Sequence, residues 1–317
     1  MENEIQNNIE NEVKKNKPYK ISKNKVIKFA ILVVSIIIFI IFMVTIIKFL
    51  TSDYHKLNKM GYDKETAKKI VAIKKSEVVK KLDYNEKMLD ILTSKYFIDK
   101  NLENYLNYYN NNKNKSIDDV IAIVNVHADK DFYSLELKTD TDLGNAMLVN
   151  KYYNLDENYE PELVNVKNWY SYGEQKVTEE VYDQFILMFD AAKEEDLTLI
   201  INDSYRSYET QKKTHKLYGD ALAARAGASE HNTGLAIDIV TYGADGDDFD
   251  QTKEFAWLSK NAHKYGFILR YPKDKEYLTG YDYESWHYRY LGRDLATKVY
   301  ESGLTYEEYY AYYIENK

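Results

Sequence analysis

A continuous apolar run over residues 29–47 limits what this chain can fold into more than any other feature of its sequence. Ser35 and Thr45 are the only polar residues in the run. A helix of this length rises about 30 Å, which is the thickness of the hydrocarbon core of a bilayer. A cleaved signal peptide has a shorter apolar core followed by a small-residue cleavage site, and residues 47–50 (Ile-Lys-Phe-Leu) contain no such site. The run therefore predicts an uncleaved transmembrane anchor.

The lysines around this run bear on its orientation. Positive charge before a first span favours a cytoplasmic N-terminus, and long domains after a span cross the membrane largely regardless of their own charge. Lysines also follow the run, between Lys48 and Lys81. We expect a single-pass protein of the cell membrane, with residues 1–28 as a cytoplasmic basic tail and the C-terminal part outside the cell. The lysines that precede the run are Lys14, Lys15, Lys17, Lys20, Lys23, Lys25 and Lys28.

Composition bounds the chemistry that the rest of the chain can perform. At 317 residues, 44% of them hydrophobic, the chain is long enough for one domain with a packed core and additional segments. A net charge of −8, without a basic and aromatic stripe in the C-terminal half, argues against a nucleic-acid partner. The sequence contains no cysteine, which excludes disulfides, cysteine-bound zinc and thiol catalysis. Any metal ion must therefore be held by histidine and carboxylate side chains.

The segment after the apolar run is rich in lysine and asparagine and predicts short helices over residues 48–115. Asp63, Ser76 and Asn85 are the expected N-caps of these helices. Residues 110–114 (Asn-Asn-Asn-Lys-Asn) form a polar stretch that predicts a linker. We interpret 48–115 as a helical stalk and 116–317 as the domain that carries the chemistry.

Strand and helix patterns alternate irregularly in the C-terminal part. The absence of a regular strand–helix–strand rhythm predicts an α+β fold with a small, mostly antiparallel sheet flanked by helices. Thr178 is expected to cap a long amphipathic helix with Val181, Phe185 and Met188 on its buried stripe. Helices are also expected over 207–225 and 252–264, and from Thr305. The predicted strands are 120–126, 147–150, 197–201, 235–240, 267–271 and 284–290.

Two of the six histidines stand in patterns that suit a catalytic zinc ion. Such an ion needs three nitrogen or oxygen ligands, leaves one position for a water molecule whose pKa falls to about 7, and needs a nearby carboxylate as proton acceptor. His231, Asp238 and His287 can supply the ligands, and Glu284 can be the base. In a regular strand, Glu284 and His287 would point to opposite faces. A bend or strand end between them is therefore required.

These patterns resemble the two signatures of the LAS metallopeptidases (lysostaphin, Ala-Ala peptidases and hedgehog-type domains). Residues 229–238 read Ser-Glu-His-Asn-Thr-Gly-Leu-Ala-Ile-Asp, which matches Ser-x-His-x-x-Gly-x-Ala-x-Asp, and residues 284–287 read Glu-Ser-Trp-His, which matches Glu-x-Trp-His. Residues 204–211 (Ser-Tyr-Arg-Ser-Tyr-Glu-Thr-Gln) resemble the Tyr-Arg-Ser segment of the VanY-type carboxypeptidases in this group. The resemblance covers about 116–300, with the three motifs in the expected order.

The resemblance implies a LAS-type peptidase fold and a zinc-dependent D-alanyl-D-alanine carboxypeptidase with one Zn²⁺ per chain. Its partner would be a peptidoglycan stem peptide or precursor, from which the C-terminal D-Ala is removed. Glu284 would be the catalytic base, and Arg206 would hold the scissile carbonyl or its oxyanion. The implied zinc ligands are His231, Asp238 and His287, and the implied substrate contacts are Ser229, Gln211 and Tyr271.

Other functions fit parts of the same pattern. An L,D-carboxypeptidase acting on tetrapeptide stems would have the same motifs. A dipeptidase that acts on free D-Ala-D-Ala is a cytoplasmic enzyme and does not suit a domain outside the cell. A non-catalytic wall-binding module would have no use for the base Glu284, which is present. We interpret the remaining histidines, His55, His127, His215 and His263, as structural.

The predicted orientation can be tested on intact protoplasts of a cell that makes the protein. Protease added outside is expected to digest residues 116–317, because the span places them on the outer side. Immunoblotting with an antibody against the C-terminal part measures the loss. Protection of this part in intact protoplasts, with digestion only after lysis, would reverse the orientation and place the substrate in the cytoplasm.

Overall fold

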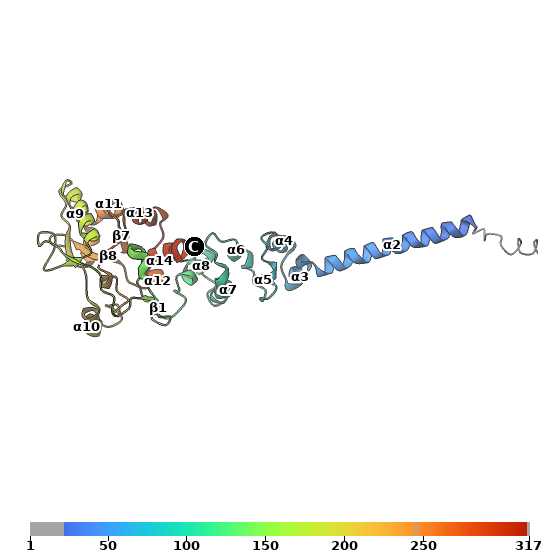
Figure 1. Ribbon diagram of the computed structural model, residues 1–317, viewed down its shortest axis with the longest axis horizontal. Coiled ribbons are helices and arrows are strands. Elements are labelled where there is room, and N and C mark those ends of the chain that lie inside the picture. Colours follow the sequence, from blue (N-terminus) through green and yellow to red (C-terminus); the bar gives the residue numbers. More distant parts are fainter. Residues whose placement is uncertain (1–21, 245, 316–317) are drawn as a thin grey trace, which may run out of the picture. The chain divides into compact units, whose positions relative to one another are not determined.

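The computed structural model describes residues 22–244 and 246–315 (Figure 1). The chain divides into two compact units, Met1–Leu89 and Asp90–Lys317. The first contains the apolar helix and a group of short helices, and the second contains the sheet and all the predicted site residues. The lysines predicted to orient the span at 14, 15, 17 and 20 lie outside the described residues.

The first unit begins with the long apolar helix α2 (Lys23–Thr51), which contains the whole predicted span. None of its side chains is buried, and among the described residues it is the one helix long and apolar enough to cross a membrane. Within the helix, the Ser35 hydroxyl donates to the Ile31 carbonyl and the Thr45 hydroxyl to the Ile41 carbonyl. The two polar side chains in the run are therefore satisfied by the helix's own backbone, as an apolar environment requires.

Three short helices follow in the same unit: α3 (Asp53–Met60), α4 (Lys64–Ala72) and α5 (Ser76–Val79). Asp63 caps α4 as predicted, since its carboxylate accepts from the backbone N–H groups of Glu65 and Thr66. The prediction that Ser76 is an N-cap is wrong. Its hydroxyl instead donates to the Asp53 carboxylate at 2.6 Å, and Lys80 binds the other oxygen of that carboxylate. A long-range hydrogen bond thus replaces the local cap.

The second unit starts with α6 (Met88–Leu92), which spans the boundary, and continues with α7 (Leu102–Asn111) and α8 (Ile117–Asn125). The amide of Asn125 accepts from Asn101 and from the Tyr105 hydroxyl, and it donates to the Tyr96 carbonyl. These bonds join α7 to α8. The compact unit therefore begins well before residue 116, where the sequence predicted the start of the catalytic domain.

Two of the predicted strands are wrong. Residues 120–126 lie mostly in helix α8, whose residues are buried from Val120 to Asn125, so this part of the helix has the continuous apolar composition of an interior strand. Ser116 caps this helix by accepting from the Asp119 N–H. Residues 147–150 are buried but lie outside the strands of the sheet. The carbonyl of Met147 accepts from the Arg289 guanidinium, so a side chain takes the place of a neighbouring strand.

The central sheet has the order β5 (Ile200–Asp203), β6 (Ala236–Val240), β8 (Glu284–Tyr290), β7 (Phe267–Tyr271), and its neighbours are antiparallel. This confirms the α+β prediction with a small antiparallel sheet. Two short pairs accompany it in the described chain. They are β1 (Leu137–Lys138) with β2 (Tyr153–Asn154), which is parallel, and β3 (Val164–Asn165) with β4 (Lys176–Val177), which is antiparallel.

One face of the sheet is apolar and is covered by α9 (Glu179–Lys193) and α11 (Lys253–Asn261), which lie together in Figure 1. Ile237 and Tyr288 belong to this core, together with the predicted stripe of α9. The alternation along a strand then turns Asp238 and His287 to the opposite face. The remaining helical segments are η1 (Asp99–Asn101), η2 (Thr141–Ala146), α10 (Tyr208–Tyr218), η3 (Glu230–Thr233), η4 (Gly246–Gln251), η5 (Ala262–Tyr265), α12 (Glu276–Thr279), α13 (Arg293–Ser302), α14 (Tyr306–Tyr310) and η6 (Ala311–Glu315).

Gly234 makes the turn between η3 and β6, and its backbone conformation allows the effect of a substitution to be predicted. Its φ is +71°, and an added Cβ would lie 2.7 Å from Leu163 Cδ2. Gly234→Ala is expected to lower the free energy of unfolding by the left-handed penalty, roughly 1–2 kcal/mol, and by a further amount for the crowding. Denaturant titration of the detergent-solubilised chain measures the loss. Gly303→Ala is the matched control, since Gly303 has φ +68° with open space around it. If both variants lost the same unfolding free energy, the contact between the added Cβ and Leu163 would have no cost.

Candidate active site

Three predicted ligands meet on the polar face of the sheet. One donor atom each from His231, Asp238 and His287 lies within 4.8 Å of the others. Asp238 Oδ1 is 2.9 Å from His287 Nδ1 and 3.5 Å from His231 Nε2. Asp238 and His287 are direct partners across β6 and β8, so the strand register brings them together. The chain turns at Gly234, directly after the 3₁₀ segment η3, and this turn places His231 beside the other two ligands.

The backbone of residues 204–206 fixes the orientation of His231. The Nδ1 atom lies 2.6 Å from the Ser204 carbonyl, which can only accept, so Nδ1 carries the hydrogen. The Nε2 lone pair is then left facing Asp238. The Arg206 N–H donates to the His231 carbonyl, and the Asn232 side chain donates to the Arg206 carbonyl. These two hydrogen bonds join η3 to the turn that follows β5, one at His231 and one at Asn232.

The bend that the sequence required between Glu284 and His287 is present in β8. Leu269 pairs with Tyr288 and Tyr271 pairs with Glu284, so a step of two residues along β7 is matched by four along β8. This irregularity turns Glu284 to the side of the ligands, with Oε2 3.8 Å from His287 Nδ1. Its side chain is 30% exposed, whereas that of His287 is 3% exposed. Glu284 thus stands beside the cluster at its open side.

The charges at the site are strongly coupled. Burial alone would raise the pKa of Asp238, but His231 and His287 outweigh it and hold that pKa well below its usual range. Burial would lower the pKa of His287, yet its hydrogen bonds to Asp238 and Glu230 raise it to about 10. Burial also raises the pKa of Glu284, with the Asp238 charge adding to the rise. The carboxylates therefore create a negative potential that favours a cation at this spot.

Arg206 lies at the turn that leaves β5, as predicted. Its guanidinium donates from Nη1 to Asp203 at 2.8 Å. A bulge in β5 makes Asp203, rather than Asn202, the partner of Asp238, so this ion pair lies next to the ligand strand. The charge of Arg206 also acts on the carboxyl of Glu284, whose pKa it lowers in part. Its Nε is buried without a hydrogen-bond partner among the described residues, so the fork keeps unused donor capacity.

The three predicted substrate contacts are all largely buried. Tyr271 is 4% exposed, and its ring stacks on the His287 ring with centroids 4.9 Å apart. Gln211 is fully buried and donates to the Ala224 carbonyl, which ties α10 to the following loop. Ser229 is 5% exposed and immediately precedes η3. Tyr271 therefore contacts a predicted ligand directly and Ser229 lies two residues before another, whereas Gln211 bonds within its own segment.

The residues behind the candidate ligands were not predicted from the sequence. Glu230 is fully buried and faces the far nitrogen of His287 at 3.4 Å. Arg270 and Arg289 are buried beside it and bind its other oxygen. A signal for them existed, because both arginines lie within segments predicted to be strands, and an arginine that a strand buries needs a charged partner.

The donor set fits a catalytic zinc site. Two imidazole nitrogens and one carboxylate oxygen converge, which is the three-ligand pattern that leaves a position for water or substrate. Each histidine also has a hydrogen-bond partner on its other nitrogen, Ser204 O for His231 and Glu230 for His287. Such outer partners fix the ring orientation at metal sites. The open side carries Glu284, so a proton acceptor lies where the free position would be.

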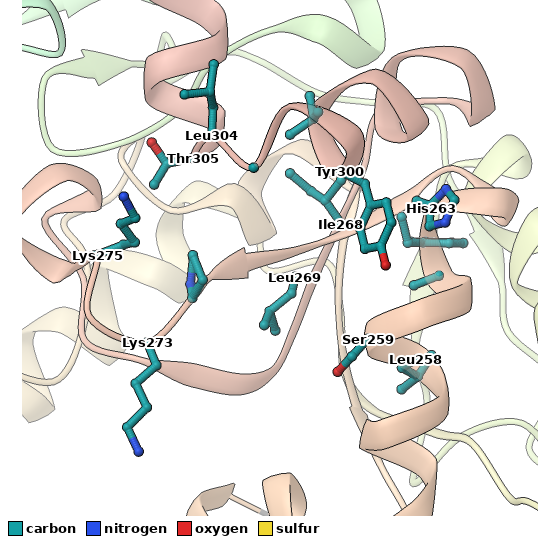
Figure 2. Close-up of a pocket in the computed structure, with 15 residues that line it drawn as sticks. Leu258, Ser259, His263, Ile268, Leu269, Lys273, Lys275, Tyr300, Leu304 and Thr305 are labelled. Atoms are coloured by element: carbon teal, nitrogen blue, oxygen red, sulfur yellow. The ribbon is translucent and has the colours of Figure 1, made fainter. Parts of the chain in front are cut away.

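A separate hollow of about 300 Å³ lies along the outer edge of β7, between α11 and α13 (Figure 2). Figure 2 shows Leu269 at its centre, with Lys273 and Lys275 on one side and His263 and Tyr300 on the other. None of the predicted ligands, Glu284 or Arg206 lines it. The chemistry-bearing groups therefore belong to the polar face of the sheet and not to this hollow.

Known proteins with the same features place the chain in a family. The profile of the VanY family, D-alanyl-D-alanine carboxypeptidase, matches residues 174–293. The chain is 43% identical over 179 residues to YodJ of Bacillus subtilis (strain 168), with 51% of this chain and 66% of YodJ covered. It is 32% identical over 184 residues to VanXYC of Enterococcus gallinarum, a bifunctional D-Ala-D-Ala dipeptidase and D-Ala-D-Ala carboxypeptidase, with 54% and 95% covered. Among solved structures it is similar to the LdcB LD-carboxypeptidase, with a TM-score of 0.52, 39% identity, and 55% and 89% covered.

This chain belongs to the VanY family of carboxypeptidases. The family predicted from the motifs is thereby confirmed. The matched residues 174–293 include the 204–211 segment, the 229–238 motif and the 284–287 motif. For three curated relatives, YodJ among them, the shared segment spans only 51–66% of the relative's length.

Removing a candidate ligand is expected to remove the metal. His231→Ala deletes one of three donors, so the detergent-solubilised chain should lose bound zinc and activity together, while wild type binds one zinc ion. Metal content after gel filtration, measured by atomic emission, checks this. His215→Ala is the matched control, because His215 pairs with Asp220 in another part of the unit. A His231→Ala chain that keeps its zinc would remove His231 from the ligand set.

Proposed function

We propose that this protein is a zinc-dependent D-alanyl-D-alanine carboxypeptidase that removes the C-terminal D-Ala from peptidoglycan stem peptides. The observation that carries the proposal is the convergence of His231, Asp238 and His287 with Glu284 on their open side. Membership of the VanY family supports the reaction and the substrate class. The zinc ligands, the base and the substrate contacts are those named from the motifs.

The chemistry divides among the residues of the site. Zinc held by the three ligands supplies Lewis acidity, which makes a water molecule an effective nucleophile near neutral pH. Glu284 accepts the proton of the attacking water and passes it to the amine of the departing D-Ala. Its raised pKa and its position at the open side suit a group that takes up and releases a proton within one cycle.

Arg206 faces the same side and has donors to spare. We assign it to the scissile carbonyl, whose oxygen gains negative charge as water adds. A guanidinium offers rigid paired donors, and Asp203 holds one of them at 2.8 Å so that the fork is oriented before substrate arrives. Ser229 and Gln211 shape the wall on the substrate side, and Tyr271 packs on His287.

An L,D-carboxypeptidase activity on tetrapeptide stems is the second candidate, because LdcB is an LD-carboxypeptidase. A wall-binding module without catalysis would not need Glu284 beside the metal ligands. We also propose that α2 anchors the protein in the cell membrane, with its second unit outside and close to substrates attached to the membrane or wall. The length and apolarity of α2 support the anchor, and the lysines before it support the orientation.

The proposed reaction and its base can be tested together. The full chain in detergent, with zinc, is incubated with synthetic pentapeptide, tetrapeptide and D-Ala-D-Ala, and the products are identified by mass. We expect release of D-Ala from the pentapeptide. Glu284→Gln keeps the size of the side chain but cannot take the proton, so zinc content should stay at the wild-type level while turnover falls by roughly 10²–10⁴-fold.

Arg206→Ala serves as the contrasting variant. It should also keep zinc, and it should lose transition-state stabilisation on the order of 2.7–4 kcal/mol. Preferred cleavage of the tetrapeptide would replace the D,D assignment by the L,D one, and a chain that binds peptide without cleaving it would support the wall-binding module. Loss of zinc in Glu284→Gln would make Glu284 a ligand, and Asp238 would then be the first ligand to question.

A further inference from the structure

Four charged side chains are buried directly behind the metal ligands. The side chains of Glu230, Arg270 and Arg289 are 0% exposed, and that of Glu307 is 1% exposed. Two positive and two negative groups balance one another. Replacing such a group by apolar residues of similar volume is often neutral or stabilising, so buried ion pairs are weak evidence for a purely stabilising role. Their arrangement around His287 points to another role.

The two oxygens of Glu230 have separate partners. Oε1 accepts from Arg270 Nε at 2.7 Å and from Arg289 Nη1 at 2.8 Å. Oε2 faces His287 Nε2 at 3.4 Å, at the long end of hydrogen-bond distances. The two guanidiniums hold one oxygen and thereby aim the other at the histidine. Both ring nitrogens of His287 face carboxylates, Nδ1 facing Asp238 and Nε2 facing Glu230. With Oε2 of Glu230 accepting from Nε2–H, a metal ion on the Asp238 side would take the place of the proton on Nδ1.

The network continues into the C-terminal helix α14. Arg270 donates from Nη1 and Nη2 to the two oxygens of Glu307, at 2.9 and 2.5 Å. Asn150 donates to the same carboxylate at 3.2 Å. A capping box between Thr305 and Glu308 starts α14 and holds Glu307 in register. Glu307 lies beyond residue 293, so this anchor comes from a segment that the family profile does not match.

We propose that Glu230 is a positioning residue that orients His287 for metal binding, and that Glu307 of α14 holds Glu230 in place through Arg270. The inference rests on the proposed function, since it assumes a metal ion at His231, Asp238 and His287. It adds a reason for the C-terminal segment to be part of the catalytic unit. Helix α14 supplies no metal ligand. Its Glu307 holds Arg270, and Arg270 holds the Glu230 carboxylate that orients His287.

A positioning role and a structural role make different predictions. If the network only stabilises the fold, its loss lowers the melting temperature and leaves the metal site of the folded protein unchanged. If it orients His287, its loss weakens metal binding in protein that is still folded and changes the geometry around the ion. Co²⁺ bound in place of zinc reports that geometry through its visible absorption, which a structural loss elsewhere would not move.

The experiment uses the full chain in detergent. Zinc dissociation constants are measured by competition with a chelator, and Co²⁺ spectra are recorded for wild type, Glu230→Gln and Glu307→Gln. For Glu230→Gln we expect zinc affinity to fall by roughly 10–100-fold, the range found for outer partners of metal ligands, with a shifted Co²⁺ spectrum. Glu307→Gln should weaken zinc binding in the same direction by a smaller factor, because it acts through Arg270.

Glu308→Gln is the matched control. It makes the same substitution at the next residue of the same helix, and glutamine preserves a capping box. Glu308 accepts from the Thr305 N–H and hydroxyl, whereas Arg270 bonds to Glu307. Its zinc affinity and Co²⁺ spectrum should equal those of wild type. If Glu307→Gln is indistinguishable from Glu308→Gln in both measurements, the link from α14 to His287 is refuted.

A charge-balanced variant covers the case in which Glu230→Gln does not fold. Arg270→Met combined with Glu307→Gln removes one charge of each sign and leaves Glu230 paired with Arg289. Weaker zinc binding with a shifted Co²⁺ spectrum in this folded protein supports the inference, and wild-type values overturn it. The wild-type arm separates the two proposals. Wild-type chain that binds no zinc overturns both, whereas normal wild-type binding with unaffected variants overturns the positioning role alone.

Discussion

The pairing of Asp238 with His287 across β6 and β8 is the constraint on which the rest of the site depends. It places a carboxylate and an imidazole side by side on the face of the sheet that α9 and α11 leave uncovered. A slip of β8 by one residue against β6 would turn His287 towards the apolar core while Asp238 kept its face, and the pair would be lost. The register is held by the packing of Ile237 and Tyr288 on the other face, so the hydrophobic core and the metal site are specified by the same strands. The turn at Gly234 and the irregularity in β8 then add His231 and Glu284 to a pair that the sheet has already formed.

Electrostatics explains why the centre is surrounded by buried charge. Asp238, Glu284 and Glu230 bring three carboxylates close together, an arrangement that repels itself unless cations balance it. Arg270 and Arg289 balance Glu230 from behind, and burial of these groups is tolerated because each is hydrogen-bonded. The front of the cluster, at Asp238 and Glu284, is balanced in the described structure only by the two histidines and by Arg206. A divalent cation beside Asp238 and Glu284 would balance their negative charge, as Arg270 and Arg289 balance that of Glu230.

Much of this could be predicted from the sequence, and the failures have physical causes. The strands at 267–271 and 284–290 were predicted with correct bounds and the helix after Thr178 with its correct start, because the strand and helix patterns are strong there. Residues 120–126 failed because a helix buried on every side has the same composition as an interior strand. The bend in β8 was predicted from chemistry alone, since Glu284 and His287 had to share a face. The role of Glu230 could not be read from its neighbours in the chain, because its partners Arg270, Arg289 and Glu307 are far away in sequence and meet it only after folding.

The location of Glu284 and His287 on one strand has a consequence for how such a protein changes over evolution. The proposed proton acceptor and a proposed ligand of the ion are separated by two residues of a paired strand, so their spacing does not depend on any loop. Arg206, Gln211 and Ser229 lie instead on the segment between β5 and β6, outside the sheet. Changes at Gln211 and Ser229 can therefore leave Asp238, Glu284 and His287 in place, because those three belong to paired strands. His231 and Arg206 share the segment, so only the part of the cluster that the sheet carries is protected from such changes.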